Sequence, residues 1–301
     1  MKKKITGLIV FLVAITVTLV AFLPLEYAKN KEGKSWMKSL GNDTKLAQVS
    51  IPGTHDSGAL YSIADLSGRC QTLTIKNQME IGVRFFDIRL KQDGDDLKVV
   101  HSFVDQKTDF AKVLRQMENF LKENPSEFLI VSIKEDADAK NPIEPFDKAV
   151  KKALEKRSSV VNFSTELAKT VGEARGKIHI ISRFNGDFGV PCYYGWQDST
   201  SFEIGEIFVQ DNYCITEVDT KINDIKACFE KSSSHEYSLC INFASCYLDG
   251  AFPPTYAGTP ARTINEWLLA NLSSQNGSLG VVLCDFITTD LAKAIYRRNI
   301  V

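Results

Sequence analysis

The chain has 301 residues, of which 44% are hydrophobic and 24% are charged; this ordinary globular composition excludes a disordered or collagen-like chain. It carries 36 Lys and Arg against 37 Asp and Glu, a formal net charge of −1. With no basic excess, we expect no nucleic acid partner held by a broad positive surface. The length exceeds that of an average domain, yet one large α/β barrel would use all of it.

The N-terminus has the pattern of an export signal. Lysines at positions 2 to 4 precede an apolar run from Ile5 to Leu25, and this single long run excludes a polytopic membrane protein. The run is about as long as a bilayer core, and no clean small-residue cleavage site follows it. Residues 1–28 are therefore either a cleaved signal peptide or a retained signal anchor. In both cases we expect residues 29–301 to be secreted or anchored at the outer cell surface.

Seven cysteines suit an exported protein with some disulfides, although the odd number leaves at least one thiol free. Their spacing forms neither a CxxC pair nor a zinc pattern with histidine. Cys240, Cys246 and Cys284 lie in or beside apolar runs. We therefore expect these three to be small buried side chains, and the sequence leaves the pairing of the others open.

Short apolar runs alternate with helical segments along the chain. Strands are predicted at 46–51, 83–90, 97–102, 128–134, 177–183, 206–211, 238–243 and 280–286. Helices are predicted at 74–80, 109–123, 145–155, 164–174, 219–231, 263–272 and 289–299. Most strands are near-continuous apolar runs, which is typical of parallel strands covered on both faces. Eight of them predict a single distorted (β/α)8 TIM-type barrel, irregular because the 91–96 link is too short for a crossover helix.

Polar residues recur at the carboxyl ends of the predicted strands, where barrel enzymes place their chemistry. Each of them alone is more simply a structural ion pair. Together they should face one barrel mouth, which favours a functional site. The set is His55, Asp56, Asp87, Arg89, His101, Lys134, Arg183, Asp211, Tyr213 and Asp285.

These residue types suit general acid–base catalysis on an anionic phosphoester. One imidazole near its natural pKa can take a proton from a hydroxyl, and a second can return a proton to the leaving oxygen. Arg89 offers a rigid fork of donors to phosphate oxygens and keeps its charge. Covalent catalysis is less attractive, because the chain has no G-x-S-x-G motif and no cysteine convincingly placed at a strand end beside a histidine.

Metal-assisted catalysis is the main rival. Four aspartates could hold a hard cation: Asp56, Asp87, Asp211 and Asp285. However, Arg89 follows Asp87 by two residues and so shares its strand face, inside the zone that such a cation would fill. We therefore prefer a mechanism without metal and expect no cofactor.

Seven segments in chain order resemble the bacterial phosphatidylinositol-specific phospholipase C family. They are IPGTHDS (51–57), QMEIGVRFFDIR (78–89), VVH (99–101), FLIVSIKE (128–135), ISR (181–183), VQDNY (209–213) and CDF (284–286). The resemblance spans residues 46–299 and implies a distorted (β/α)8 barrel. It also implies a lyase reaction that releases diacylglycerol and inositol 1,2-cyclic phosphate.

The resemblance assigns a role to each catalytic residue. It makes His55 the general base on the inositol 2-hydroxyl, oriented by Asp285. It makes His101 the general acid for the diacylglycerol oxygen, partnered by Asp56. It places Arg89 on the phosphate, where calcium-dependent relatives hold a metal ion.

The resemblance also assigns the residues around the head group. Asp87 belongs to the catalytic polar network. Lys134, Arg183 and Asp211 are expected to meet the inositol hydroxyls, and Tyr213 is expected to stack on the ring. The implied partner is phosphatidylinositol, or a glycosyl-phosphatidylinositol anchor, at a membrane surface, bound by a monomer.

Two alternative functions stay open. One is a barrel phosphodiesterase acting on another glycerophosphodiester or a sphingolipid; the other is a non-catalytic inositol-lipid binding module, which would not need both His55 and His101. The aromatic and proline-rich loop 247–256 is expected either to enter the membrane interface or to cover the pocket. Of the remaining histidines, His179 is predicted in the core and His235 in a solvated turn.

Overall fold

The computed structural model describes residues 32–62, 68–249 and 258–300. The apolar run predicted as a signal or anchor lies outside these residues, as does most of the 247–256 loop. Among the described residues, no helix combines the length and the apolar character needed to cross a membrane.

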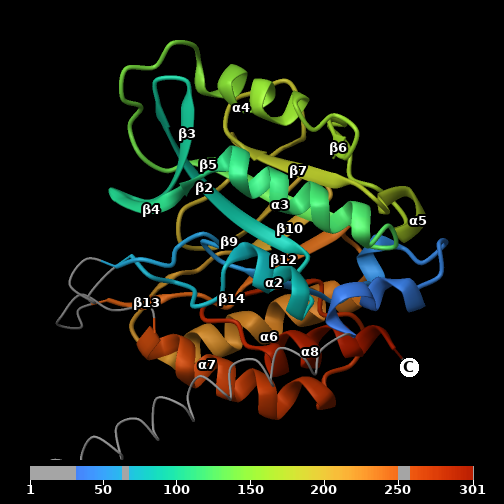
Figure 1. The fold of residues 1–301 in the computed structure, drawn as a ribbon. Coiled ribbons are helices and arrows are strands. Elements are labelled where there is room, and N and C mark those ends of the chain that lie inside the picture. Colours follow the sequence, from blue (N-terminus) through green and yellow to red (C-terminus); the bar gives the residue numbers. More distant parts are fainter. Residues whose placement is uncertain (1–31, 63–67, 250–257, 301) are drawn as a thin grey trace, which may run out of the picture.

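A curled, twelve-stranded mixed sheet organises the fold (Figure 1). Its main path runs β6-β7-β5-β2-β1-β14-β12-β10-β9, and every neighbouring pair except β10–β9 is parallel. The parallel strands are β1 Ile51–Thr54, β2 Phe85–Asp93, β5 Leu129–Glu135, β6 Val161–Asn162, β7 Ile178–Arg183, β10 Ile207–Gln210, β12 Leu239–Phe243 and β14 Val281–Cys284. Eight parallel strands on an open path confirm the predicted distorted barrel.

The other strands decorate this barrel. The hairpin β3 Asp96–His101 and β4 Val104–Asp109 extends β2, and β8 Val190–Pro191 pairs with β7. The edge strand β9 Ser201–Ile204 runs antiparallel to β10. A separate two-stranded sheet joins β11 Cys214–Ile215 to β13 Tyr247–Leu248.

The structure corrects the strand predictions at three places. The 97–102 segment is strand β3, but it turns back antiparallel on β2 instead of entering the barrel, because Gly94 adopts a positive φ in the short link. The eighth parallel strand is β6, which was missed because it has only two residues. The 46–51 strand begins late: a 3-10 turn occupies Leu46–Gln48, and β1 starts at Ile51.

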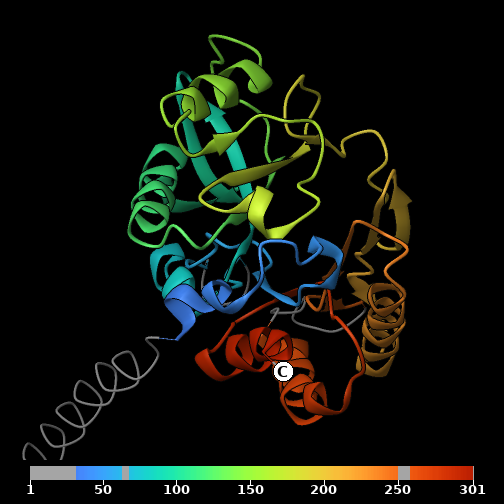
Figure 2. The ribbon, with the colours of Figure 1, turned by 90° about the vertical axis from the view of Figure 1, so that its right-hand side faces the viewer.

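Seven α-helices of the described residues pack on the sheet: α2 Ile75–Ile81, α3 Phe110–Glu123, α4 Phe146–Glu155, α5 Val171–Ala174, α6 Val218–Ser234, α7 Gly258–Asn271 and α8 Thr289–Tyr296. Figure 2 shows α3 and α4 in green on one side and α6, α7 and α8 in orange to red on the other. The 164–174 helix prediction was wrong for its first part. Thr170 and Glu173 form a capping box, so the helix begins only at Val171.

Alternating side chains divide the core into two clusters. Phe85 packs inside the barrel with Ile51 and Phe243, whereas Phe86 packs outside under the helices. His179 is 5% exposed and its Nε2 lies 3.1 Å from the Ala174 carbonyl, which confirms its core placement. His235 ends α6 in a left-handed conformation and is exposed, as predicted.

The cysteines correct one expectation. All seven lie in the described residues and all are free thiols, so the expected disulfides are not formed. Cys240, Cys246 and Cys284 are buried, as predicted. The fold is therefore stabilised by its packed core rather than by covalent links.

Candidate active site

A cavity of about 600 Å³ opens at the carboxyl ends of the parallel strands. Eight of the ten predicted site residues line it: His55, Arg89, His101, Lys134, Arg183, Asp211, Tyr213 and Asp285. The other two, Asp56 and Asp87, lie fully buried beneath it and contact Arg89. The structure therefore brings all ten together.

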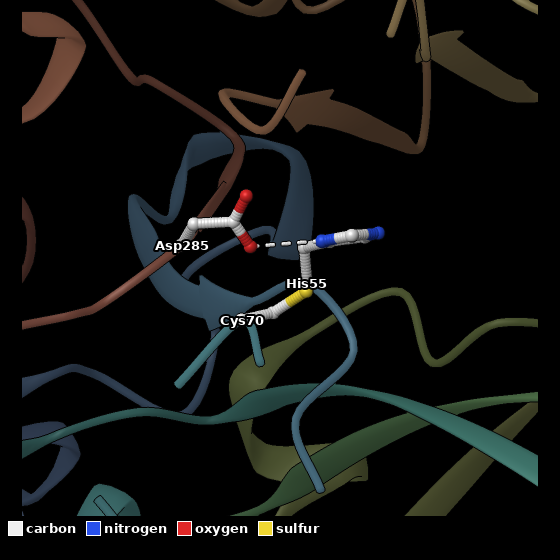
Figure 3. A group of neighbouring side chains, drawn as sticks. All are labelled: His55, Cys70 and Asp285. Carbon is white, nitrogen blue, oxygen red and sulfur yellow. Dashed lines mark hydrogen bonds and ion pairs between the residues drawn. The ribbon is translucent and has the colours of Figure 1, made fainter. Parts of the chain in front are cut away.

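His55 follows β1 and is held from both sides of its ring. Its Nδ1 lies 2.8 Å from Oδ1 of Asp285, the residue after β14, because β1 and β14 are adjacent parallel strands (Figure 3). Arg89 Nη2 lies 2.7 Å from His55 Nε2. A guanidinium only donates, so Nε2 accepts and Nδ1 carries the proton donated to Asp285. His55 is therefore a neutral imidazole with its basic nitrogen toward Arg89.

Charge around His55 also tunes its proton affinity. Burial acts to lower the pKa of His55, but the charge and hydrogen bond of Asp285, together with the charge of Asp87, place the pKa above its ordinary value overall. A histidine with a carboxylate on its far nitrogen is suited to accept a proton from a substrate hydroxyl.

Arg89, in β2, is surrounded by three carboxylates. Its Nε lies 3.2 Å from Asp87 and 3.6 Å from Asp56, and its Nη1 lies 3.7 Å from Asp136. Burial opposes the charge of Arg89, but these carboxylates raise its pKa well above the ordinary value. Burial likewise acts to raise the pKa of Asp87, but Arg89 and Arg183 bring it below its usual range. The site thus contains a permanent, oriented cation.

His101, the last residue of β3, faces the same region more loosely. Its Nε2 lies 3.7 Å from Oδ2 of Asp56, too long for a hydrogen bond. Asp56 is fully buried, and neither of its carboxylate oxygens has a hydrogen-bond partner among the described residues. Burial raises the pKa of Asp56 to about 6. This pair therefore keeps unused hydrogen-bonding capacity in the cavity.

Asp136 is a site residue that the sequence analysis missed. It accepts hydrogen bonds of 2.7 Å from Lys134 Nζ and from the backbone N–H of Ser102, next to His101. Burial acts to raise its pKa, but Arg89 and Lys134 lower it overall. Strand alternation was the available signal, because Lys134 and Asp136 are two residues apart and share one face. Asp136 therefore links the β3–β4 hairpin, which carries His101, to the cations Arg89 and Lys134.

Another part of the cavity lining presents aromatic and polar groups. The Arg183 guanidinium lies 3.7 Å from the centre of the Trp196 ring, and Trp196 Nε1 donates to Asp211 Oδ2 at 3.0 Å. Tyr213 donates its hydroxyl hydrogen to Asp198. Trp196 and Asp198 were missed because they precede β9 in a loop without a strand-end signal. This wall can bind a polyhydroxylated ring by hydrogen bonds and stacking.

Two clusters of the described residues bring three metal-ligating atoms within 4.8 Å of one another: His55, Cys70 and Asp285, and Asp56, Cys70 and His101. Neither is the oxygen-rich site that a hard cation prefers. Burial raises the pKa of the Cys70 thiol well above its ordinary value. Arg89 also supplies positive charge beside Asp56 and Asp87. The donor set therefore does not fit a calcium or magnesium cofactor.

Residues 49–184 match the family model described as phosphatidylinositol-specific phospholipase C, X domain. The chain is 26% identical to the 1-phosphatidylinositol phosphodiesterase of Listeria monocytogenes, over 88% of this chain and 85% of the relative. It is 28% identical to a Staphylococcus aureus protein of the same name, over 85% of each.

Solved structures show the same fold. The phosphatidylinositol-specific phospholipase C of Listeria monocytogenes is 26% identical with a TM-score of 0.72, over 89% of this chain and 98% of that one. A mutant of the Staphylococcus aureus enzyme is 22% identical with a TM-score of 0.78, over 88% and 98%. The family resemblance of the sequence motifs is confirmed.

Proposed function

Because residues 49–184 match the phosphatidylinositol-specific phospholipase C X-domain model and the chain is similar to bacterial 1-phosphatidylinositol phosphodiesterases, we propose that it cleaves phosphatidylinositol into diacylglycerol and inositol 1,2-cyclic phosphate. One observation carries the proposal: two histidines, each beside a buried aspartate, face one cavity with a fixed arginine between them. The cavity size suits a head group, because small-molecule sites typically enclose about 300–1,000 Å³.

The first half of the reaction uses His55. Its Nε2 takes the proton of the inositol 2-hydroxyl, and that oxygen attacks phosphorus to form the cyclic ester. Asp285 stabilises the imidazolium that results. Arg89 binds the non-bridging phosphate oxygens and stabilises the negative charge of the transition state. The guanidinium that holds Nε2 in the free protein thus lies where the phosphate must enter.

The second half uses His101. As the bond from phosphorus to the glycerol oxygen breaks, protonated His101 gives its proton to that oxygen, and diacylglycerol leaves neutral. Oδ2 of the buried Asp56 lies 3.7 Å from His101 Nε2. The same two histidines in exchanged roles allow water to open the cyclic phosphate slowly.

The head group is expected to meet the rest of the cavity lining. Lys134 and Arg183 offer donors to the inositol hydroxyls, Asp211 offers an acceptor, and Tyr213 offers its ring for stacking. Binding is expected at a membrane surface, by a monomer that is secreted or held by its N-terminal segment. Phosphatidylinositol and glycosyl-phosphatidylinositol share this head group, so both are included.

Substrate profiling in chelator tests the proposal. Purified protein is incubated with phosphatidylinositol vesicles in EDTA, and the phosphorus resonances of the products are followed. We expect a cyclic phosphodiester to appear first and inositol phosphate later, with no reaction on phosphatidylcholine or phosphatidylglycerol vesicles. His235→Ala, which changes a histidine outside the cavity, serves as the active control. Activity only on other lipids, or only with added calcium, would refute the proposal.

A further inference from the structure

Cys70 places a sulfur ligand in the cavity that the proposed reaction does not use. Its side chain is 1% exposed yet lines the cavity. The sulfur lies within 4.8 Å of ligand atoms of both Asp56 and His101, and also of His55 and Asp285 (Figure 3). Thiolate, imidazole and carboxylate are the ligands that Zn²⁺ takes in proteins.

We propose that Asp56, Cys70 and His101 form a binding site for Zn²⁺, and that zinc bound there inhibits the enzyme. Zn²⁺ bonds of about 2.0–2.3 Å in tetrahedral geometry separate neighbouring ligand atoms by roughly 3.3–3.8 Å. Asp56 Oδ2 and His101 Nε2 are already 3.7 Å apart. The fourth position would face the cavity and take water.

Unused hydrogen-bonding capacity is the second observation for this site. Asp56 is fully buried, and both of its carboxylate oxygens lack a hydrogen-bond partner among the described residues. A buried carboxylate in that condition is costly. A metal ion bound to Asp56 would offset part of this desolvation cost. A carboxylate that already accepts hydrogen bonds would gain less from binding the ion.

The cluster with His55 is the weaker choice. His55 Nδ1 and Asp285 Oδ1 are joined by a 2.8 Å hydrogen bond. A metal ion would have to break that bond and remove its proton. Asp56 and His101 share no such bond, so zinc displaces nothing between them.

The charges in the site balance when zinc binds. Cys70 loses its thiol proton to the solvent as the zinc–sulfur bond forms. The thiolate and the Asp56 carboxylate then neutralise the two charges of Zn²⁺. Arg89 gives up its longer contact with Asp56 Oδ2 at 3.6 Å and keeps its ion pair with Asp87 at 3.2 Å. Because zinc would occupy His101 and its aspartate, the general acid of the proposed reaction is lost.

Direct binding tests the site without reference to turnover. The full chain, reduced by a phosphine, is titrated with Zn²⁺ against a colorimetric chelator, and with Co²⁺ for the absorption band of thiolate ligation. We expect one zinc per molecule. Cys70→Ala and His101→Gln should each weaken binding by at least about tenfold. Cys246→Ala, which removes another buried cysteine of the cavity wall, and His55→Gln should bind as wild type does.

Turnover tests the inhibition, which rests on the proposed function. Zn²⁺ should inhibit phosphatidylinositol cleavage and EDTA should restore it, whereas Ca²⁺ and Mg²⁺ should have no effect. Relative to its own zinc-free rate, Cys70→Ala should need at least about tenfold more zinc for the same inhibition.

The outcomes separate the two proposals. Absence of stoichiometric zinc binding, or equal binding by Cys70→Ala and wild type, overturns the site. Loss of binding in His55→Gln but not in His101→Gln overturns the choice of ligands. Thiolate-ligated zinc in a protein that cleaves no inositol lipid would support the site and refute the proposed function instead.

Discussion

The amino and carboxyl ends of the barrel both bury arginine–carboxylate pairs, but they satisfy them differently. At the amino end, Arg84 precedes β2 and donates to Glu127 at 3.0 Å and to the carbonyls of Met79, Val83 and Gly33 at 2.8 Å each. Both charged side chains are fully buried. The Arg84 guanidinium therefore donates to a carboxylate and to backbone carbonyls of the protein itself.

At the carboxyl end, the charged groups around Arg89 leave some of their polar atoms without hydrogen bonds to the described part of the chain. Arg89 forms ion pairs with three carboxylates at nitrogen–oxygen distances of 3.2 to 3.7 Å. Polar atoms of Asp56, His101 and Asp285 lack hydrogen-bond partners among the described residues. Similar side chains thus serve stability at one end and stay available to a substrate at the other. The comparison predicts separate effects for mutations at the two ends.

The largest effect is expected at the carboxyl end, on turnover. His55→Ala and His101→Ala should each lower kcat by about 10²–10⁴-fold, because each removes a proton-transfer group. Neither should lower the melting temperature or abolish binding to phosphatidylinositol vesicles. Turnover equal to wild type in either variant would remove that histidine from the mechanism.

The next effect is expected at the amino end, on stability. Glu127→Ala leaves the buried Arg84 without its carboxylate and should cost about 3–5 kcal/mol in urea unfolding. Glu266→Ala, which breaks the exposed pair with Arg262, should cost less than about 1 kcal/mol. Equal losses in the two variants would contradict the role given to the amino end.

A charge reversal at Arg89 should lower turnover less than the loss of either catalytic histidine does. Arg89→Asp removes the donor to the phosphate oxygens and should lower kcat by about 10²–10³-fold in chelator. It also places a carboxylate beside Asp87 and Asp56, so added Ca²⁺ should restore part of the activity. Unchanged rates in chelator would show that Arg89 does not act on the phosphate.

The smallest effect concerns pH. The base must be neutral, so activity should rise as pH passes the pKa of His55, which Asp285 raises above its ordinary value. In Asp285→Asn that influence is gone, while burial and Arg89 still lower the pKa of His55. The acid limb of kcat/KM should therefore move to lower pH. A shift in the opposite direction would contradict the pairing.

The sequence predicted the fold where elements are long and strongly patterned. Strands β5 and β7 are near-continuous apolar runs that end in polar residues, and their parallel pairing followed from that pattern. The two-residue β6 has no such pattern, and its pairing with β7 depends on tertiary contacts. The direction of β3 depended on the turn at Gly94, which an apolar run does not reveal.

The candidate site was predictable because the carboxyl ends of all parallel strands lie at the same end of a barrel. His55 and Asp285 are 230 residues apart, yet they meet because β1 and β14 are neighbours. Trp196 and Asp198 come from an irregular loop, where position has no simple rule. The sequence also could not show that the Asp56 carboxylate oxygens lack hydrogen-bond partners among the described residues, because this depends on how the side chains pack in three dimensions.

The central claim is that His55 acts as base and His101 as acid on one phosphorus. The most direct measurement compares both alanine variants on phosphatidylinositol and on an inositol phosphodiester with a nitrophenol leaving group, which needs no proton to depart. We expect His101→Ala to recover most of its activity on the nitrophenyl ester, while His55→Ala stays slow on both substrates. Equal losses for both variants on both substrates would contradict this division of roles.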